Sequence, residues 1–292
     1  MGLDINMVQF LIDARKGGAQ FGEMLTIGRQ QLNVYPARMV QILRKHGLPH
    51  EAFLADAAQS QFAEPCFQAL GVKQIYSLDA SDFEGASFVH DLNRPLPAEL
   101  KERFDTVLDG GTLEHVFNFP VAIQNCMEML RVGGRFFIHT CANNLCGHGF
   151  YQFSPELFYR IFSPGNGFEV ERIVLHRVGP YGRWYEVPDP NQIRSRIELI
   201  TFTPIHLMVQ ARRTKVVPIF SSMPQQSDYM ALWQEGSQAK HLQSKGASST
   251  GNWFQRTLPG LARFVHVIKT GIEFYSRQSF RNRKCFRPVR RP

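Results

Sequence analysis

The sequence lacks long apolar runs, a secretion leader and paired cysteine motifs. No apolar run approaches the roughly 20 residues that a membrane-spanning helix needs. The N-terminal stretch has no charged region followed by an apolar region and a cleavage site, and Asn6 stands where a myristoylation signal has Ser or Thr. The five cysteines are odd in number and show no CxxC spacing, which is typical of free thiols in a reducing compartment. We therefore expect a cytoplasmic protein.

Several catalytic signatures are missing as well. No GxxxxGK[ST], GxSxG or HExxH sequence is present, which argues against the common NTPases, serine hydrolases and zinc proteases. Cys141 and Cys146 lie near His139 and His148, but neither a second cysteine pair nor an HxxxH spacing accompanies them. We therefore expect no metal site, and we expect His139, inside a strand, to be a core residue.

Positive charge is concentrated at the end of the chain. The net charge is +8, yet residues 252–292 alone hold ten lysines and arginines against one glutamate. The preceding residues therefore sum to −1. The basic character belongs to this tail and says little about what the main domain binds.

Strand-like and helix-like patterns alternate through the first three quarters of the chain. This alternation is typical of a parallel sheet covered by helices on both faces. Helices are predicted over residues 64–72, over residues 119–130, and from Pro155, which follows Ser154 as the helix cap. The predicted strands are residues 24–28, 74–79, 86–92, 104–111, 131–140, 168–178 and 198–213.

These patterns divide the chain into two parts. For residues 1–213 these patterns predict an α/β domain with a Rossmann-like doubly wound sheet of seven strands and an insertion at about 33–65. Residues 214–292 predict a linker and a basic, aromatic extension, because residues 225–252 are rich in Gln, Ser and Gly. From Leu258 onward a helix is expected, with apolar residues on one side and basic residues on the other.

Three acidic residues stand at the ends of successive predicted strands. Ligands of a doubly wound sheet bind outside the carboxyl ends of its strands, so these residues converge on one crevice. Asp79 is placed to accept from ribose hydroxyls, and Asp91 from an adenine amino group. Asp109 is followed by Gly110 and Gly111, which let the backbone approach a ligand closely. The pattern predicts a nucleoside-binding crevice.

Two motifs in this region resemble a known family. The segments FDTVLDGGTLEHVFN (104–118) and MLRVGGRFFIHT (129–140) resemble class I S-adenosylmethionine-dependent methyltransferases, and the resemblance spans about residues 23–213. It implies S-adenosylmethionine as the cofactor and methyl transfer to an O, N or C atom. The cofactor-binding residues that it implies are Gly28, Asp79, Asp91, Leu92, Asp109, Gly110, Glu114 and His115.

The first loop departs from the family pattern. The family has an acidic residue and three glycines there, roughly DxGxGxG, whereas this chain reads MLTIGRQ (24–30). Gly28 matches the first glycine, Thr26 replaces the acidic residue, and Arg29 and Gln30 replace small residues. Either the amino-acid end of the cofactor is held differently, or the domain is a degenerate, non-catalytic one.

The loop after the fifth predicted strand supplies the candidates for the acceptor site. Glycines flank His148, and Tyr151 follows it. A histidine with a pKa near 6.5 is able to take a proton from an acceptor hydroxyl, so His148 and Tyr151 are the candidate catalytic residues. The alternative is that His148 packs against or caps the following helix. His115 is expected to line the cofactor side of the pocket.

The leading hypothesis is a methyltransferase that acts on a small metabolite or a sugar-containing precursor. The alternatives are a degenerate scaffold associated with a membrane, and a nucleic-acid methyltransferase. The basic tail suits an anionic membrane surface, which would place the protein at the inner face of a membrane, or nucleic-acid phosphates. It is also consistent with a solvated helix or a disordered end.

Overall fold

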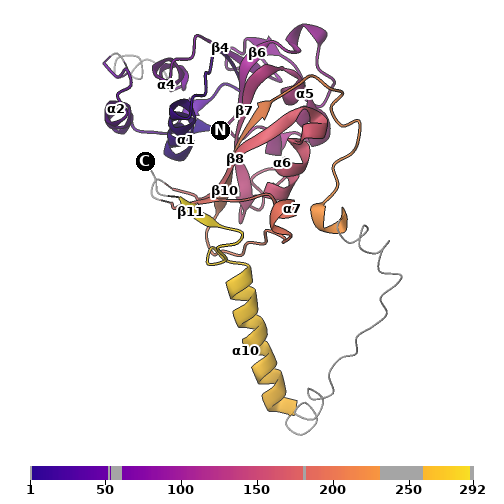
Figure 1. The fold of residues 1–292 in the computed structure, drawn as a ribbon. Helices are drawn as coiled ribbons and strands as arrows, with labels where there is room; N and C mark the ends of the chain where they lie inside the picture. Colours follow the sequence, from indigo (N-terminus) through magenta and orange to yellow (C-terminus); the bar gives the residue numbers. More distant parts are fainter. Residues whose placement is uncertain (1, 52, 54–60, 180–181, 231–258, 290–292) are drawn as a thin grey trace.

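The chain forms three layers, with a sheet between two groups of helices (Figure 1). The structure is a computed structural model, and it describes residues 2–51, 53, 61–179, 182–230 and 259–289. The sheet has nine strands. They are β2 (Glu23–Ile27), β4 (Gln74–Asp79), β5 (Phe88–Val89), β6 (Phe104–Asp109), β7 (Leu130–Asn143), β8 (Phe168–Arg177), β9 (Trp184–Glu186), β10 (Ile205–Arg213) and β11 (Arg287–Val289).

The strand order makes this a doubly wound sheet. The order is β11-β9-β8-β10-β7-β6-β2-β4-β5, and the run from β7 to β5 is parallel throughout. β10 lies antiparallel between β7 and β8. Read from the β5 edge, the parallel strands are β5-β4-β2-β6-β7. Numbered by their order in the chain, they are 3-2-1-4-5, so the order reverses direction between β2 and β6. That reversal is the point at which doubly wound sheets bind ligands.

The sheet differs from the prediction in its count and in several bounds. It has nine strands rather than seven, because β9 and β11 extend it beyond β8. The predicted last strand begins only at Ile205, because Pro204 has no N–H to give and Ile200 N donates instead to the carbonyl of Gln278. The predicted third strand shortens to β5, because the chain turns at Asp91 and bonds Arg94 N to the Asp91 carbonyl.

Helices cover both faces of the sheet, and alternate residues of each strand supply the two cores. Along β7, Phe137 packs in one core, while Phe136 and Ile138 pack in the other, as the two-residue period of a strand requires. The first core includes α1 (Ile5–Lys16), α2 (Pro36–Lys45) and α4 (Glu64–Ala69). On the other side lie α5 (Phe119–Glu128), α6 (Pro155–Ile161) and α7 (Pro190–Ile193).

Local signals explain where several helices begin. Ser154 Oγ accepts from Leu157 N at 3.4 Å, and Pro155 opens α6, which confirms the predicted cap. Asp4 caps α1 by accepting from the N–H groups of Asn6 and Met7, each at 2.9 Å. Three single-turn 3₁₀ helices are η1 (Ala98–Leu100), η2 (Leu113–His115) and η3 (Pro164–Asn166).

The chain after β2 does not enter a helix directly. It forms the short strand β3 (Gln31–Leu32), which pairs in parallel with β1 (Gly2–Leu3) at the start of the chain. On its other side, Leu32 N donates to the carbonyl of Gln61 and Ala63 N to that of Gln30. The predicted insertion therefore returns to this loop, and the chain's start is brought beside the carboxyl end of β2.

The basic extension contributes one exposed helix and one strand of the sheet. Helix α10 (Pro259–Arg277) projects away from the body (Figure 1). The chain then returns, so that Phe280 stacks on Tyr185 with ring centroids 3.9 Å apart and Phe286 is fully buried. The predicted linker 225–252 lies outside the described residues from 231 onward.

No helix among the described residues is both long enough and apolar enough to cross a bilayer.

Two phenylalanines of the extension test this packing. Replacing buried Phe286 by alanine should lower the free energy of unfolding by about 3–5 kcal/mol, because it leaves a cavity beneath β9 and β11. Replacing Phe274, which is 47% exposed on α10, should change that free energy by less than about 0.5 kcal/mol. Urea unfolding measures both. Equal, small effects would mean that the C-terminal strand is not part of the core.

Candidate functional site at the carboxyl edge of the sheet

The ends of β2, β4 and β6 lie side by side at one edge of the sheet. Ile27, the last residue of β2, pairs with Leu78 on one side and with Asp109 on the other. Asp79 directly follows Leu78, and Val89 of β5 pairs with Asp79. Strand register alone therefore places Gly28, Asp79 and Asp109 at this edge.

Gly28 provides the turn that opens the edge. Its φ is +70°, in the left-handed region that favours glycine. A Cβ placed on it would lie 3.3 Å from Thr112 Oγ1 and 3.7 Å from Asp79 Oδ2. A larger residue at position 28 would therefore be strained and would press on Thr112 Oγ1, while its distance to Asp79 would be an ordinary contact. Gly28 thus lies beside the Asp79 carboxylate at the end of β2.

Solvent exposure differs among Asp79, Asp91 and Leu92. Asp79 is half-buried, and its Oδ1 accepts from Ala80 N at 2.6 Å. Asp91 is exposed, and hydrogen bonds from the backbone and side chain of Asn93 hold the pKa of its carboxyl below the usual range. Leu92 is buried in the core beside α5. Of the two carboxylates, only that of Asp79 lies against Gly28.

Asp109 ends β6 inside the protein. It is fully buried, and its Oδ1 accepts from Thr112 N at 2.9 Å. Its Oδ2 has no hydrogen-bond partner among the described residues. Burial, together with the neighbouring Glu114 carboxylate, raises the pKa of Asp109 well above its ordinary value. Ionisation of this carboxyl beneath the edge is therefore disfavoured in the folded protein.

Gln30 fills the space that the edge would offer to a ligand. Its Nε2 donates to the carbonyls of Ile27, at 2.7 Å, and of Gly28, at 3.2 Å. Thr112 Oγ1 donates to the same Ile27 carbonyl at 2.8 Å, which occupies both lone pairs of that oxygen. A Cβ on Gly110 would lie 2.0 Å from Gln30 Oε1, so the amide rests directly on the Gly110 backbone.

The buried amide of Gln30 is only partly satisfied. The side chain is 2% exposed, and its Oε1 has no hydrogen-bond partner among the described residues. An unpaired buried oxygen costs free energy, which a ligand with an N–H donor would recover. Gln30 also lines a cavity of about 190 Å³ between β2, β4 and α4, below the 300–1,000 Å³ typical of ligand pockets.

Arg29, the other departure from the family loop, makes its side-chain contacts with residues outside the edge. Its Nε donates to Glu64 Oε1 at 2.7 Å, its NH1 donates to the carbonyl of Glu84 at 3.0 Å, and its guanidinium stacks over Phe62. Glu64 and Phe62 come from the returning insertion. Arg29 thus anchors the insertion to the loop after β2.

Glu114 joins this edge to the loop that follows β7. It is almost fully buried, and its Oε2 accepts from Thr140 Oγ1 at 2.9 Å. Its backbone carbonyl accepts from the N–H groups of Phe150 and Tyr151. A Cβ on Gly149 would lie 2.8 Å from that carbonyl, so the contact requires a glycine there.

The candidate acceptor residues lie on this loop. His148 is exposed, and its Nε2 lies 3.7 Å from Glu114 Oε1. His115 is exposed, and its ring centroid is 5.2 Å from that of His148. Tyr151 is half-buried, and its hydroxyl donates to the Phe117 carbonyl at 2.6 Å. The structure therefore brings His148, Glu114 and His115 together, while Tyr151 holds the loop in place.

Sequence reasoning underrated two of these residues. Gln30 was noted only as a replacement for a small residue, and its position over Gly110 depends on the insertion returning through residue 63. Glu114 was named only among the cofactor-binding residues that the resemblance implies. Its buried side chain accepts from Thr140 Oγ1 of β7. Gly149 was the signal in the sequence for the close approach of the acceptor loop to the Glu114 backbone carbonyl.

Comparison with known proteins gives structural likeness only. No family model matches the chain, and no curated protein sequence matches it. Among solved structures, a Bacillus halodurans putative methyltransferase is 11% identical, with 70% of this chain and 99% of that chain covered and a TM-score of 0.35. The YcgJ protein of Bacillus subtilis is 10% identical, with 73% and 100% covered and a TM-score of 0.40.

A third solved structure carries a bound product. It is the Burkholderia thailandensis 1,6-didemethyltoxoflavin-N1-methyltransferase with 1,6-didemethyltoxoflavin and S-adenosylhomocysteine, 16% identical, with 72% of this chain and 79% of that chain covered and a TM-score of 0.37. These likenesses are too distant to bear on activity. The doubly wound order of the strands rests instead on their observed pairing.

The burial of Asp109 has a measurable consequence for stability. Because its pKa is raised in the folded protein, its ionisation opposes folding as pH rises above the unfolded value of about 3.9. Replacing Asp109 by asparagine keeps an oxygen for Thr112 N and removes that ionisation. The stability of Asp109→Asn relative to the unaltered protein should therefore increase between pH 4 and pH 8, measured by urea unfolding. A difference that does not change with pH would contradict this assignment.

Proposed function

We propose that this chain is an S-adenosylmethionine-dependent methyltransferase whose acceptor is a small molecule or a sugar-containing precursor. The observation that supports it most is the half-buried Asp79 carboxylate beside the left-handed Gly28, at the reversal point of the sheet. Carboxylates at this place accept from ribose hydroxyls in doubly wound folds. The sequence motifs at 104–118 and 129–140 support the same assignment.

The residues present fit the nucleoside end of the cofactor better than its amino-acid end. Asp79 and the open backbone at Gly28 suit a ribose. At the other end, Gln30 already donates to the carbonyls that a cofactor ammonium group would otherwise meet. Binding therefore requires the Gln30 amide to move off Gly110, after which its Oε1 becomes an acceptor for that ammonium. When bound, the cofactor would supply an electrophilic methyl group.

His148 is placed to take the acceptor's proton. Its imidazole is exposed on the loop, and its Nε2 lies 3.7 Å from Oε1 of the buried Glu114 carboxylate, which orients the ring. Beside it, Phe117 and Phe150 are 72% and 69% exposed, with ring centroids 5.9 Å apart. Exposed aromatic faces of this kind suit the flat, apolar face of a sugar or another ring.

Cofactor binding tests this proposal. Isothermal titration with S-adenosylmethionine should show binding by the unaltered protein, and Asp79→Ala should weaken it at least about tenfold, because a charge-assisted hydrogen bond contributes about 1.5–3 kcal/mol. Asp82→Ala, which removes an exposed acidic residue three positions away, is the matched control and should bind normally.

Gln30→Gly separates an active site from a degenerate one. If Gln30 only covers the site, this variant should bind the cofactor more tightly than the unaltered protein, and if it also contacts the cofactor, more weakly. Absence of heat for both the unaltered protein and Gln30→Gly would exclude the methyltransferase proposal and leave the scaffold alternative.

A second proposal concerns the partner of α10, which we infer to be an anionic membrane surface. Eight large apolar residues cover one half of this helix, and all are between 45% and 66% exposed. They are Leu261, Phe264, Val265, Val267, Ile268, Ile272, Phe274 and Tyr275. An apolar face of this size on an exposed helix is typical of helices that lie in the membrane interface.

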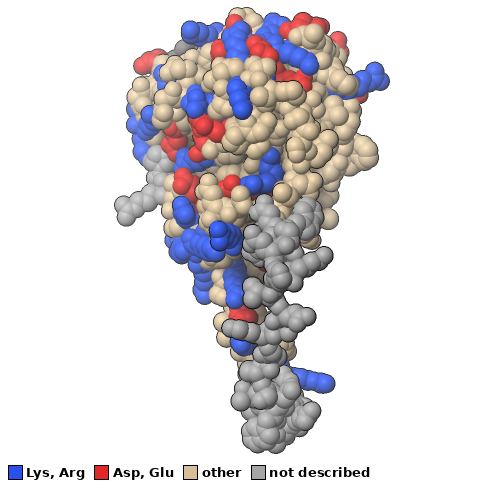
Figure 2. Space-filling view, turned by 45° about the vertical axis from the view of Figure 1, so that its right-hand side comes forward, with Lys and Arg blue, Asp and Glu red and all other residues tan. Residues whose placement is uncertain are grey.

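The charge around α10 suits lipid phosphates. The opposite half of the helix carries Arg263, Lys269 and Arg277, against the single acidic Glu273. Where α10 meets the body, a cavity of about 480 Å³ is lined by four arginines, Arg177, Arg183, Arg281 and Arg283. Lys and Arg side chains gather where the body narrows toward this helix (Figure 2). Each basic residue near an anionic surface contributes about 1 kcal/mol to binding.

Vesicle sedimentation tests the membrane proposal. The full chain should sediment with vesicles that contain phosphatidylserine and much less with neutral phosphatidylcholine vesicles, and high salt should weaken the association. The double variant Phe264→Ser/Ile268→Ser should lose most of this binding, whereas His266→Ser/Thr270→Ser, on the polar half, should keep it. Equal sedimentation of the two double variants, or salt-dependent binding of RNA but not of vesicles, would overturn the proposal.

A further inference from the structure

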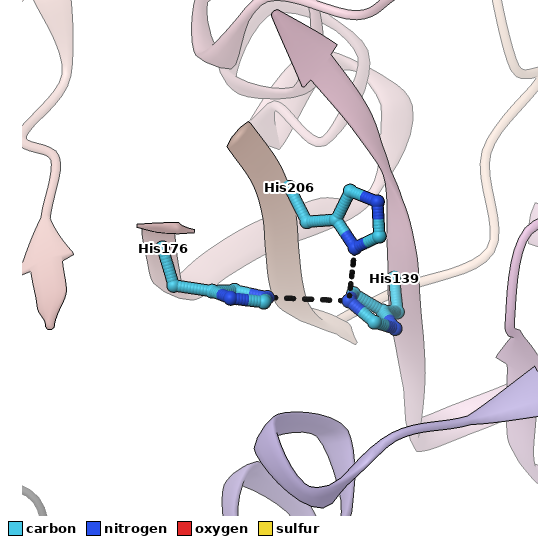
Figure 3. A group of neighbouring side chains, drawn as sticks. All are labelled: His139, His176 and His206. Carbon is cyan, nitrogen blue, oxygen red and sulfur yellow. Dashed lines mark hydrogen bonds between the residues drawn. The ribbon is translucent and has the colours of Figure 1, made fainter. Parts of the chain in front are cut away.

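Three histidines from neighbouring strands converge on one point of the sheet (Figure 3). His139 comes from β7, His176 from β8, and His206 from β10, which lies between them. The Nε2 of His139 lies 3.2 Å from the Nε2 of His176 and 3.1 Å from the Nδ1 of His206. His139 and His176 are buried, while His206 is partly exposed.

The three facing nitrogens have room for at most one N–H among them. His176 Nδ1 lies 2.9 Å from the carbonyl of Arg177, which only accepts, so this nitrogen carries the ring proton and Nε2 carries the lone pair. If His139 Nε2 holds a proton, it meets two acceptors with one hydrogen. If instead His206 Nδ1 holds it, two lone pairs face each other across 3.2 Å. A cation at the convergence point would accept all three lone pairs.

Two of the three nitrogen separations are close to those of a tetrahedral metal site. Zn–N bonds of about 2.0–2.1 Å at tetrahedral angles put the ligand nitrogens about 3.3–3.4 Å apart. The 3.1 and 3.2 Å separations from His139 need only small ring movements to reach that spacing, and the His176 and His206 nitrogens, within 4.8 Å of each other, would have to move to it as well. The hydrogen bond from His176 Nδ1 to a backbone carbonyl is the arrangement that commonly orients a metal-bound imidazole.

An acidic residue lies beside the three histidines. Asp4, the cap of α1, interacts electrostatically with both His139 and His176. A carboxylate beside the cluster would offset part of the charge of a divalent ion.

We propose that His139, His176 and His206 form a binding site for a divalent transition metal ion of the zinc class. The three imidazoles supply three ligands, and the partly exposed side at His206 leaves the fourth position to water or to a bound molecule. This site ties together β7, β10 and β8 beside the N-terminal cap of α1. Its ligand His139 lies on β7, the strand that leads into the acceptor loop.

A second group, Glu114, His115 and His148, also places three ligand atoms within 4.8 Å of one another. His115 and His148 are exposed, and His148 Nε2 is 3.7 Å from the Glu114 carboxylate, so this group lacks the close convergence of the first. It is the alternative location that the experiment must distinguish.

Cobalt titration of the full chain, stripped of metal by a chelator, tests the proposal. One Co²⁺ should bind per chain and give the visible absorption of a tetrahedral site, and Zn²⁺ should displace it. His139→Gln and His206→Gln should each weaken binding at least about tenfold, since losing a ligand costs no less than losing a residue that orients one. His90→Gln, at the end of β5, is the matched control and should bind normally.

Circular dichroism shows whether each variant is folded. If His139→Gln does not fold, His206→Gln decides the outcome, because that side chain is partly exposed. The proposal is overturned if the unaltered protein binds no Co²⁺. It is also overturned if binding survives in His206→Gln, or if His115→Gln is the variant that abolishes it.

Discussion

The hydrogen bonds from the Gln30 amide to the carbonyls of Ile27 and Gly28 hold that side chain over the carboxyl edge of the sheet. Together with Thr112, Gln30 saturates the Ile27 carbonyl and covers the backbone of Gly110. Its own Oε1 is buried without a hydrogen-bond partner among the described residues. In this position, Gln30 therefore satisfies its amide N–H groups but not its amide oxygen. The edge is therefore built so that a ligand with suitable donors would gain hydrogen bonds by displacing one side chain.

Strand periodicity was enough to predict most of the sheet and the positions of Asp79 and Asp109 at the ends of β4 and β6, because a parallel register places neighbouring strand ends together. It did not predict β9 and β11, each of only three residues, since such short strands carry little pattern of their own. Their formation depends on the chain returning after α10. Whether the gathered residues bind a cofactor stays a prediction, because register places side chains but does not open a cavity.

The histidine cluster is a second feature that the sequence did not predict. His139, His176 and His206 are separated by 37 and 30 positions and have no metal-binding spacing in the sequence, so we expected His139 to be a core residue and no metal to bind. Only the antiparallel insertion of β10 between β7 and β8 brings the three rings to one point. Residues that meet through long-range strand pairing leave no local signal. The apolar face of α10, by contrast, was evident from its helical spacing.

A crystal structure grown with S-adenosylhomocysteine tests the central claim about Gln30 most directly. The account predicts a ribose hydrogen-bonded to the Asp79 carboxylate and the Gln30 amide displaced from the Gly110 backbone, with its Oε1 paired to the ligand. Density for Gln30 still lying on Gly110, with no nucleoside beside Asp79 at saturating ligand, would contradict it.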